Sequence, residues 1–484
     1  MRGFMTSLRQ FVSTAWCRPN GYREVFKISL PLIISMSSYT IMLFTDRLFL
    51  GRYALDTLAA AVPAGSLAFM FMCFFMGVVE FTNTFVAQYV GAHLPQRVGS
   101  ALWQGIYFAL AAGILLAGLS FFGANLFRLA GHTPRIQELE TVYFRILMLG
   151  AVFGLLQNAM SCFFSGRGLT MTIMVINVIC VTLNVPLNYL LINGYWGFPE
   201  MGLTGSAVAT VICQAVMVLL YIRVVFRKQN DRVYGVRRMW VFDRVLFGRL
   251  LKFGTPAGVQ FFVDLFGFTI FLLMVGRLGR DALAATNIAC SINLLAFMPM
   301  IGFSIAVSTL VGQAIGRGCP EDGVVATRSA LHLTCAYMWV LAALFVLAPE
   351  WLINIFHAPG KDAGEFAVVR RLTVDVLRFV AFYSIFDTFN VIYSGTLRGA
   401  GDTKFIGWTI TCLSLGLIVL PVTLGVVYFH AGLYTVWGFL SAYVCLLAVV
   451  FRWRYRQGRW KRMRVIEPVP SPLALVPPTI PGAD

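Results

Sequence analysis

Charged residues are scarce in this chain of 484 residues. Asp, Glu, Lys and Arg together make up 12% of the sequence, compared with about 25% in a typical soluble domain. Hydrophobic residues make up 58%, and the mean hydropathy is +0.77. A soluble core of this size could not bury so much apolar surface, whereas a lipid bilayer solvates it. The composition therefore excludes a soluble globular protein and indicates an integral membrane protein surrounded by lipid.

Patterns that bind metals or nucleotides are missing as well. The ten cysteines contain no Cys-x-x-Cys pair, and the five histidines have no metal-ligand spacing, so neither a metal cluster nor a disulfide framework is predicted. Glycine-rich segments at 165–168 and 397–403 are not followed by Gly-Lys-Ser or Gly-Lys-Thr, which excludes a phosphate-binding P-loop. We therefore expect no cofactor, no nucleotide and no ATP-driven pump. Residues 1–27 lack the short apolar core of a cleavable signal.

The sequence does contain twelve apolar stretches that are long enough to cross a bilayer, which takes about 20 helical residues. They cover residues 25–46, 57–90, 101–126, 142–164, 170–193, 203–226, 250–275, 283–315, 329–348, 372–396, 404–428 and 432–452. The second and eighth are longer than one bilayer requires, so we expect them to tilt or protrude. The chain is thus predicted to be an all-α integral membrane protein with twelve transmembrane helices.

Arg and Lys residues gather in alternate loops of this topology, so the net charge of +17 does not indicate a nucleic-acid ligand. Six basic segments share one side: the N-terminus, the loops after the second, fourth, sixth and tenth helices, and the C-terminus. The positive-inside rule assigns that side, and both termini, to the cytoplasm. The predicted parts are an N-terminal segment (1–24), a first lobe (25–226), a basic linker (227–249), a second lobe (250–453) and a tail (454–484). The tail becomes proline-rich, and we assign it no function.

The second lobe repeats the first in sequence. Residues 31–91 align without a gap with residues 256–316. Identical pairs in this register include Pro31 with Pro256, Gln88 with Gln313, and Gly91 with Gly316. An even number of spans in each copy gives both copies the same orientation. We therefore expect two parallel six-helix repeats with a site between them, which is a recurring architecture of secondary transporters.

Pro31 and Pro256 lie inside the first helix of each repeat. A proline inside a helix removes a backbone hydrogen bond and permits a bend. One interpretation is a hinge used in gating. The other is a harmless kink whose freed backbone groups are satisfied by neighbouring helices.

Acidic residues inside membrane spans are costly, so each one suggests a function. The second lobe contains Asp264 and Asp387, with Tyr383 one helical turn before Asp387. Two carboxylates close together in a low dielectric can bind Na⁺ or take up a proton, which predicts a cation-coupling site. The alternative is that each acid is held by structural hydrogen bonds or faces a water-filled cavity.

The first lobe contains Asp46, with neutral oxygens from Asn184, Asn188 and Thr210 in the fifth and sixth spans. Asn184 and Asn188 are four residues apart and therefore lie on one helical face. Such oxygens suit a hard cation or a polar network, which predicts a second cation- or proton-coupling site. The alternatives are hydrogen bonds that join helices and an interfacial position for Asp46, which is next to Arg47.

Three further polar residues interrupt apolar spans: Glu80, Gln157 and Asn158. Glu80 is a candidate counter-charge for a cationic substrate, or one half of a local salt bridge. Gln157 and Asn158 either line a substrate cleft or hydrogen-bond between packed helices.

Five segments form a pattern that is specific when taken together. They are Pro31 with Asp46 and Gly51, residues 86–92, residues 184–188, residues 202–205 and residues 397–403. With these segments the chain resembles the multidrug and toxic compound extrusion (MATE) family over about residues 22–455. The resemblance implies two six-helix lobes around a central cleft. It also implies cation-coupled antiport of amphipathic, usually cationic, organic compounds across a bacterial inner membrane.

The polar residues look most like the NorM branch of that family. The resemblance assigns cation coupling to Asp264, Tyr383 and Asp387 in the second lobe and to Asp46, Asn184, Asn188 and Thr210 in the first. The chain departs from the family at two of these positions. Asp264 stands where the family often has the longer Glu, which would weaken a cation site. Asn188 stands where another branch has Asp, which makes a strong first-lobe proton site less favourable.

We therefore predict a monomeric antiporter, not an enzyme, that exports small organic cations or amphiphiles in exchange for Na⁺ or H⁺ by alternating access. One alternative is a lipid-linked saccharide flippase of the same superfamily, which should have cationic residues along its cleft. A membrane-embedded enzyme is the other alternative, and it would need an intramembrane histidine.

Overall fold

The computed structural model describes residues 16, 18–130, 133–354 and 363–467, and no strand occurs among them. The predicted end segments 1–24 and 454–484 therefore lie partly outside the described residues. Twelve helical segments of the described chain are long and apolar enough to cross a membrane. Each coincides with one of the twelve predicted stretches, so the predicted all-α fold is confirmed.

The first lobe contains six of these spans. In chain order they are α2 (Tyr22–Tyr53), α3 (Leu55–Glu80) with α4 (Thr82–Gly91), α5 (Pro95–Leu119) with η1 (Ser120–Phe122) and α6 (Gly123–Ala130), α7 (Pro134–Ser165), α8 (Thr170–Asn193) with η2 (Tyr195–Gly197), and α9 (Gly202–Val225). The short helix α10 (Lys228–Tyr234) follows in the basic linker.

The second lobe contains the other six. They are α11 (Arg244–Arg277), α12 (Arg280–Arg317), α13 (Pro320–Leu347) with α14 (Pro349–Asn354), α15 (Ala363–Ala400), α16 (Thr403–Leu413) with η3 (Ser414–Val419) and α17 (Leu420–Val427), and α18 (Leu433–Arg456). A final turn, η4 (Arg459–Arg462), follows α18.

Helix ends follow local sequence signals. Prolines begin α5, α7 and α13, where the missing N–H group needs no partner. Gly194 and Gly318 end α8 and α12 in the left-handed conformation that favours glycine. The Asp243 carboxylate accepts hydrogen bonds from the backbone N–H groups of Val245 and Leu246, both 3.0 Å, and so caps α11. For this reason α11 begins inside the predicted linker 227–249.

The second and eighth spans are 33 and 38 residues long, as expected, and spans of 32 to 34 residues occur elsewhere in both lobes. The second span is interrupted at Phe81, between α3 and α4. By contrast, α2 continues through Pro31 and α11 through Pro256 without interruption. The hinge at these prolines stays a prediction.

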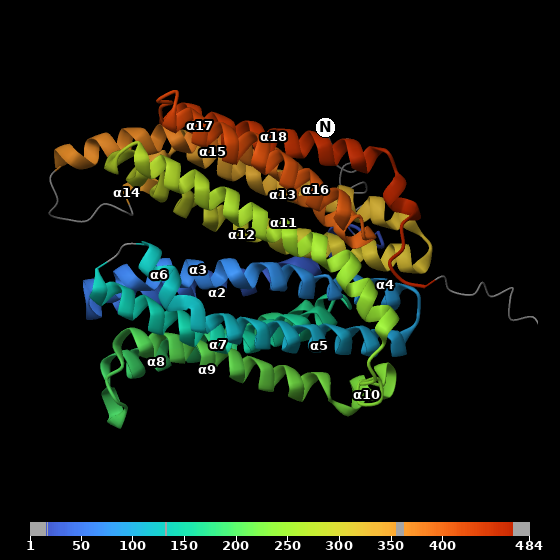
Figure 1. Cartoon of the computed structure of the whole chain (residues 1–484). Helices are drawn as coiled ribbons and strands as arrows, with labels where there is room; N and C mark the ends of the chain where they lie inside the picture. Colours follow the sequence, from blue (N-terminus) through green and yellow to red (C-terminus); the bar gives the residue numbers. More distant parts are fainter. Residues whose placement is uncertain (1–15, 17, 131–132, 355–362, 468–484) are drawn as a thin grey trace, which may run out of the picture.

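The two lobes lie as two layers with roughly parallel helices (Figure 1). Across the interface α3 packs on α11, while α2 and α4 pack on α12. These helices contain the two repeated stretches, 31–91 and 256–316. The repeat therefore forms the contact between the lobes, and most other helices surround it.

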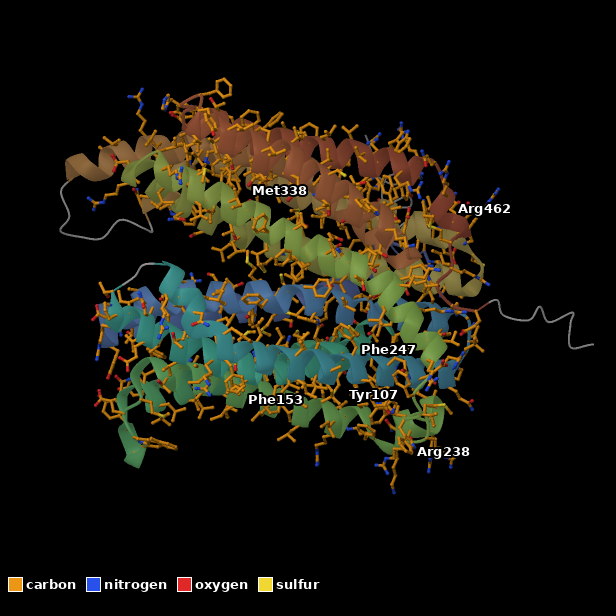
Figure 2. All side chains as sticks on the ribbon, in the orientation of Figure 1. Tyr107, Phe153, Arg238, Phe247, Met338 and Arg462 are labelled. Carbon is orange, nitrogen blue, oxygen red and sulfur yellow. The ribbon has the colours of Figure 1, made fainter. Side chains whose placement is uncertain are left out.

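Charged and apolar side chains occupy different parts of the bundle. Figure 2 shows Arg238 and Arg462 at one end, whereas Phe153 and Met338 lie midway along it. We call the end that carries α4, α10 and η4 the basic end. Large apolar side chains such as Trp339 and Leu219 are exposed on the surface, as expected for a surface in contact with lipid.

Candidate functional site

The second-lobe acids lie on neighbouring helices of one cluster. The Asp264 carboxylate on α11 accepts a hydrogen bond from the Tyr443 hydroxyl on α18, 2.9 Å away. It also interacts electrostatically with Asp387 and with Arg398, both on α15. The Asp387 carboxylate accepts a hydrogen bond from the Asn390 amide, 3.0 Å away. Asp264 and Asp387 are half-buried, and their oxygens are of the type that Na⁺ prefers.

Tyr383 belongs to the same region and is buried. Its hydroxyl accepts a hydrogen bond from the Asn293 amide on α12, 3.1 Å away, and its ring stacks on Trp437. The structure therefore brings helices α11, α12, α15 and α18 together around the predicted second-lobe residues.

The first-lobe cluster joins α2 to α8. Asp46 is only 8% exposed, and its carboxylate accepts a hydrogen bond from the Asn188 amide nitrogen. The same nitrogen donates to the Asn184 side-chain oxygen, 2.8 Å away, so the two asparagines lie on one face as their spacing predicted. Asn184 Nδ2 and Asn188 Oδ1 are buried without a hydrogen-bond partner among the described residues.

Thr210 behaves differently from the other predicted first-lobe residues. Its hydroxyl donates to the Ser206 carbonyl within α9, 3.1 Å away. This is a common way for a helical threonine to satisfy its hydroxyl. A role for Thr210 in ion coupling stays a prediction.

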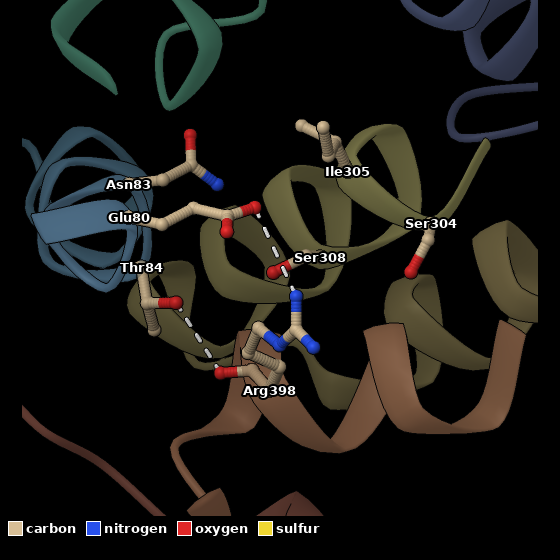
Figure 3. A pocket seen from close by; sticks show the side chains of 7 residues that line it. All are labelled: Glu80, Asn83, Thr84, Ser304, Ile305, Ser308 and Arg398. Atoms are coloured by element: carbon tan, nitrogen blue, oxygen red, sulfur yellow. Dashed lines mark hydrogen bonds and ion pairs between the residues drawn. The ribbon is translucent and has the colours of Figure 1, made fainter. Parts of the chain in front are cut away.

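A small pocket lies where the two lobes meet, and Figure 3 shows its lining. The lining residues are Glu80, Asn83 and Thr84 from the first lobe and Ser304, Ile305, Ser308 and Arg398 from the second. Glu80 and Arg398 form an ion pair at 3.8 Å, so the salt bridge of Glu80 is made across the lobes. Gln157 and Asn158 lie on α7 and are not among the described residues that line this pocket.

Polar bonds between the lobes continue from this pocket toward the basic end. Thr84 donates to the Arg398 carbonyl at 3.3 Å, and Asn83 donates to the Thr309 hydroxyl at 3.3 Å. Gln88 donates to the Gly399 carbonyl at 3.1 Å. The lobes are therefore joined at the basic end.

The MatE family model matches residues 31–190 and 256–424. The chain belongs to the MatE family. The two matched segments begin at Pro31 and Pro256, which is the register of the internal repeat. The comparison thus supports the duplication seen in the sequence.

Curated relatives of this MatE protein extend over most of its length. A probable multidrug resistance protein NorM of Thermotoga maritima is 25% identical over 452 residues, covering 93% of this chain and 95% of that protein. A probable multidrug resistance protein NorM of Pseudomonas aeruginosa is 30% identical over 397 residues, covering 79% of this chain and 78% of that protein. These relatives are named as multidrug resistance proteins, in agreement with the prediction that the chain is not an enzyme.

Solved structures share the fold of this MatE protein. One is described as the outward-facing conformation of a multidrug resistance MATE family transporter, with a TM-score of 0.83, 21% identity, and coverage of 93% of this chain and 99% of that one. Another is a MOP superfamily transporter from Pyrococcus furiosus, described as having a binding pocket of reverse polarity. It has a TM-score of 0.83 and 21% identity, and the match covers 93% of this chain and 98% of that one. At this identity the likeness shows the fold, and it confirms the predicted two-lobe architecture.

Several residues that contact the candidate sites were not identified from the sequence. Tyr443, Asn293 and Asn390 surround the second-lobe cluster, and Arg398 joins it to the pocket. Asn390 follows Asp387 at a helical spacing of three residues, so its proximity was readable from the sequence. Tyr443 and Asn293 come from other helices, and no sequence signal pairs them with the acids. Arg398 shares α15 with Asp387, but no sequence signal pairs it with Glu80 of the other lobe.

Proposed function

We propose that this MatE protein is a secondary antiporter that exports amphipathic, mostly cationic organic compounds in exchange for Na⁺ or H⁺. The observation that carries the proposal is that Asp46, Asp264 and Asp387 all lie inside membrane spans, each beside neutral hydrogen-bond donors. Carboxylates in such surroundings attract cations or protons. The names of the curated relatives support a multidrug cargo for this chain as well.

The second-lobe cluster is the stronger candidate for ion coupling. Asp264 and Asp387 offer two interacting carboxylates from two helices, and Tyr443 and Asn390 hold them in place. A cation bound by both carboxylates would draw α11 and α15 toward each other. In the first lobe, the unpartnered Asn188 Oδ1 beside Asp46 supports a second polar site, because an amide oxygen can ligate a cation or accept a hydrogen bond.

Glu80 is the proposed counter-charge for cationic cargo. Its carboxylate reaches the pocket between the lobes and is held by Arg398 only at 3.8 Å. A cation arriving in the cleft would compete with Arg398 for this carboxylate and so weaken a contact between the lobes. Gln157 and Asn158 would then contribute to the first-lobe wall of the cleft.

The proposed mechanism is alternating access. The positive-inside rule places the basic end in the cytoplasm, with both termini there, in a bacterial inner membrane. The polar bonds at the basic end then correspond to a state closed toward the cytoplasm. Coupling requires that ion and cargo differ in affinity for the two lobe arrangements. Bending at Pro31 and Pro256 is the proposed source of motion in α2 and α11, and a monomer suffices for this cycle.

A flippase for lipid-linked saccharides would need cationic side chains free to bind a pyrophosphate group. Arg398 lines the pocket, but Glu80 pairs with it. The acids inside the spans favour cationic cargo instead.

The deciding experiment is ethidium efflux from proteoliposomes driven by an imposed Na⁺ or H⁺ gradient. Wild type is compared with Asp46→Asn, Asp264→Asn and Asp387→Asn, and with Asp281→Asn as a control at an exposed acid in the first turn of α12. We expect substitution of the coupling carboxylates to abolish gradient-driven efflux, whereas the control retains it.

The two lobes give different results in this assay. If efflux requires a Na⁺ gradient and only Asp264→Asn and Asp387→Asn lose it, ion coupling is assigned to the second lobe. If efflux requires an H⁺ gradient and only Asp46→Asn loses it, ion coupling is assigned to the first lobe. If wild type moves no organic cation under either gradient, the proposed function is wrong.

A further inference from the structure

The last described residues, 459–467, form a strap across the basic end. Gly458 in the left-handed conformation (φ 69°) ends α18 and turns the chain into η4. The strap then runs back over the helix ends instead of leaving the protein. Val465 and Ile466 are buried, so this segment of the tail is packed against the bundle.

The strap is anchored on the second lobe. Trp460 is 1% exposed, stacks on Tyr455 of α18 at 5.4 Å and donates its indole N–H to the Tyr455 carbonyl. The Arg464 guanidinium donates to the carbonyls of Ile315 and Gly316 at the end of α12, 3.3 and 3.4 Å away. A buried tryptophan and a charged donor together fix this part of the strap to the second lobe.

Beyond Arg464 the strap crosses to the first lobe. The backbone N–H of Val465 donates to Gln88 Oε1 at 3.0 Å. The Glu467 carboxylate accepts hydrogen bonds from the Tyr89 hydroxyl at 2.9 Å and from Arg97 at 2.8 Å. These partners belong to α4 and α5, so a single segment of chain contacts both lobes.

Glu467 also binds a second arginine. The oxygen that pairs with Arg97 of the first lobe lies 3.0 Å from Arg249 on α11 of the second lobe. Two like charges from opposite lobes thus meet at one carboxylate. Partial burial raises the pKa of Glu467. Hydrogen bonds from its own backbone and from Tyr89, together with the charges of Arg97 and Arg249, have the larger effect and lower this pKa below its ordinary value. The carboxylate is therefore charged at neutral pH.

We infer that the strap is a latch that holds the basic end closed. Opening the basic end moves Gln88, Tyr89 and Arg97 away from the second lobe, and the strap opposes this because it is fixed to that lobe by Trp460 and Arg464. Without the Glu467 carboxylate, Arg97 keeps Asp243 as a partner at 2.9 Å, but Arg249 loses the carboxylate that it shares with Arg97. The two arginines then repel each other more strongly across the interface. Release of residues 465–467 from the first lobe is then a step of every cycle in which the basic end opens.

The latch is tested by measuring the separation of the lobes at the basic end. Spin labels are attached at Gln229→Cys on α10 and Lys404→Cys on α16, both exposed, in the full chain with its ten native cysteines replaced by alanine. Double electron–electron resonance gives the distance distribution. We expect Glu467→Gln to raise the ratio of long to short distances by about tenfold, which corresponds to ~1.4 kcal/mol. Glu467→Lys should raise it further.

Glu321→Gln is the matched control. Glu321 pairs with Lys461 of the strap at 2.8 Å, but it lies on α13 of the second lobe, so this pair does not join the lobes. The control should leave the distance distribution unchanged, and thermal unfolding checks that every variant is folded. A wild-type distribution in Glu467→Gln and Glu467→Lys overturns the latch, and so does an equal shift in Glu321→Gln. Neither result depends on which compounds the protein transports.

Discussion

Gln88 and Gln313 make equivalent hydrogen bonds in opposite directions across the lobe interface. They occupy the same position of the two repeats. The Gln88 amide donates to the Gly399 carbonyl at the end of α15, and the Gln313 amide donates to the Gly166 carbonyl at the end of α7, at 3.1 and 2.9 Å. The duplication is thus preserved as a pair of bonds that close the basic end.

Replacing either glutamine by leucine should favour an open basic end. Each change leaves a carbonyl without its donor, which costs about 1–3 kcal/mol when the group is buried. Gln88→Leu should have the larger effect because Gln88 also accepts the bond from Val465. Distance measurements between the lobes check this, with Gln96→Leu, an exposed position at the same end, as the control. If Gln88→Leu, Gln313→Leu and Gln96→Leu give the same distances between the lobes, the two glutamines do not hold the basic end closed.

Gly91→Ala should prevent the lobes from closing. A Cβ atom at Gly91 would clash with the backbone oxygen of Gln313, and the equivalent clash at Gly316 involves the oxygen of Gln88. Backbone atoms cannot rotate away, and overpacking of this kind typically costs about 1–3 kcal/mol. A cysteine at the buried Ser308 should then be alkylated several-fold faster.

The control for this substitution is Gly248→Ala in α11, where an added Cβ meets no atom within 4 Å. In an exposed helix interior the change from glycine to alanine is mildly stabilising. If Gly91→Ala and Gly248→Ala give the same alkylation rate at position 308, the close packing of α4 on α12 does not limit closure.

Charge changes in the pocket should act in opposite directions on the binding of organic cations. Glu80→Gln removes the counter-charge and should weaken ethidium binding about tenfold, a difference of ~1.4 kcal/mol. Arg398→Gln removes the competing cation and should strengthen it. Fluorescence titration of purified protein measures both, with Arg317→Gln, which pairs with Asp322 at the basic end, as the control. Weakening by both pocket variants would mean that the ion pair is only structural.

Acidification should release the basic end. Burial raises the pKa values of Asp243 and Glu467, but hydrogen bonds and arginine charges lower both below their ordinary values of 3.8 and 4.5. Their carboxylates therefore stabilise the folded, closed state fully above those values, and this contribution is lost as the pH falls through the lowered pKa values. The difference in unfolding temperature between wild type and Glu467→Gln should be constant from pH 7 to about 5 and shrink below about 4. A difference that grows on acidification would contradict this assignment.

Twelve spans, their loops and the internal repeat could be predicted from the sequence because each depends on local composition. A helix in lipid must be apolar over its own length, whatever its neighbours are. The acids inside those spans were visible for the same reason, since a charged residue stands out in an apolar run. Helical spacing also placed Asn184 beside Asn188.

Only the tertiary structure decided which residues meet. Tyr443 reaches Asp264 and Arg398 reaches Glu80 because of how α18 and α15 are rotated and packed, and hydropathy carries no information on rotation. The strap is the clearest case. From the sequence, residues 459–467 are a basic stretch at the start of a tail without assigned function, yet Trp460 and Glu467 fasten it to both lobes. The partners of Glu467 (Tyr89, Arg97 and Arg249) lie far away in the chain, so this contact exists only once the two lobes have been brought together by packing.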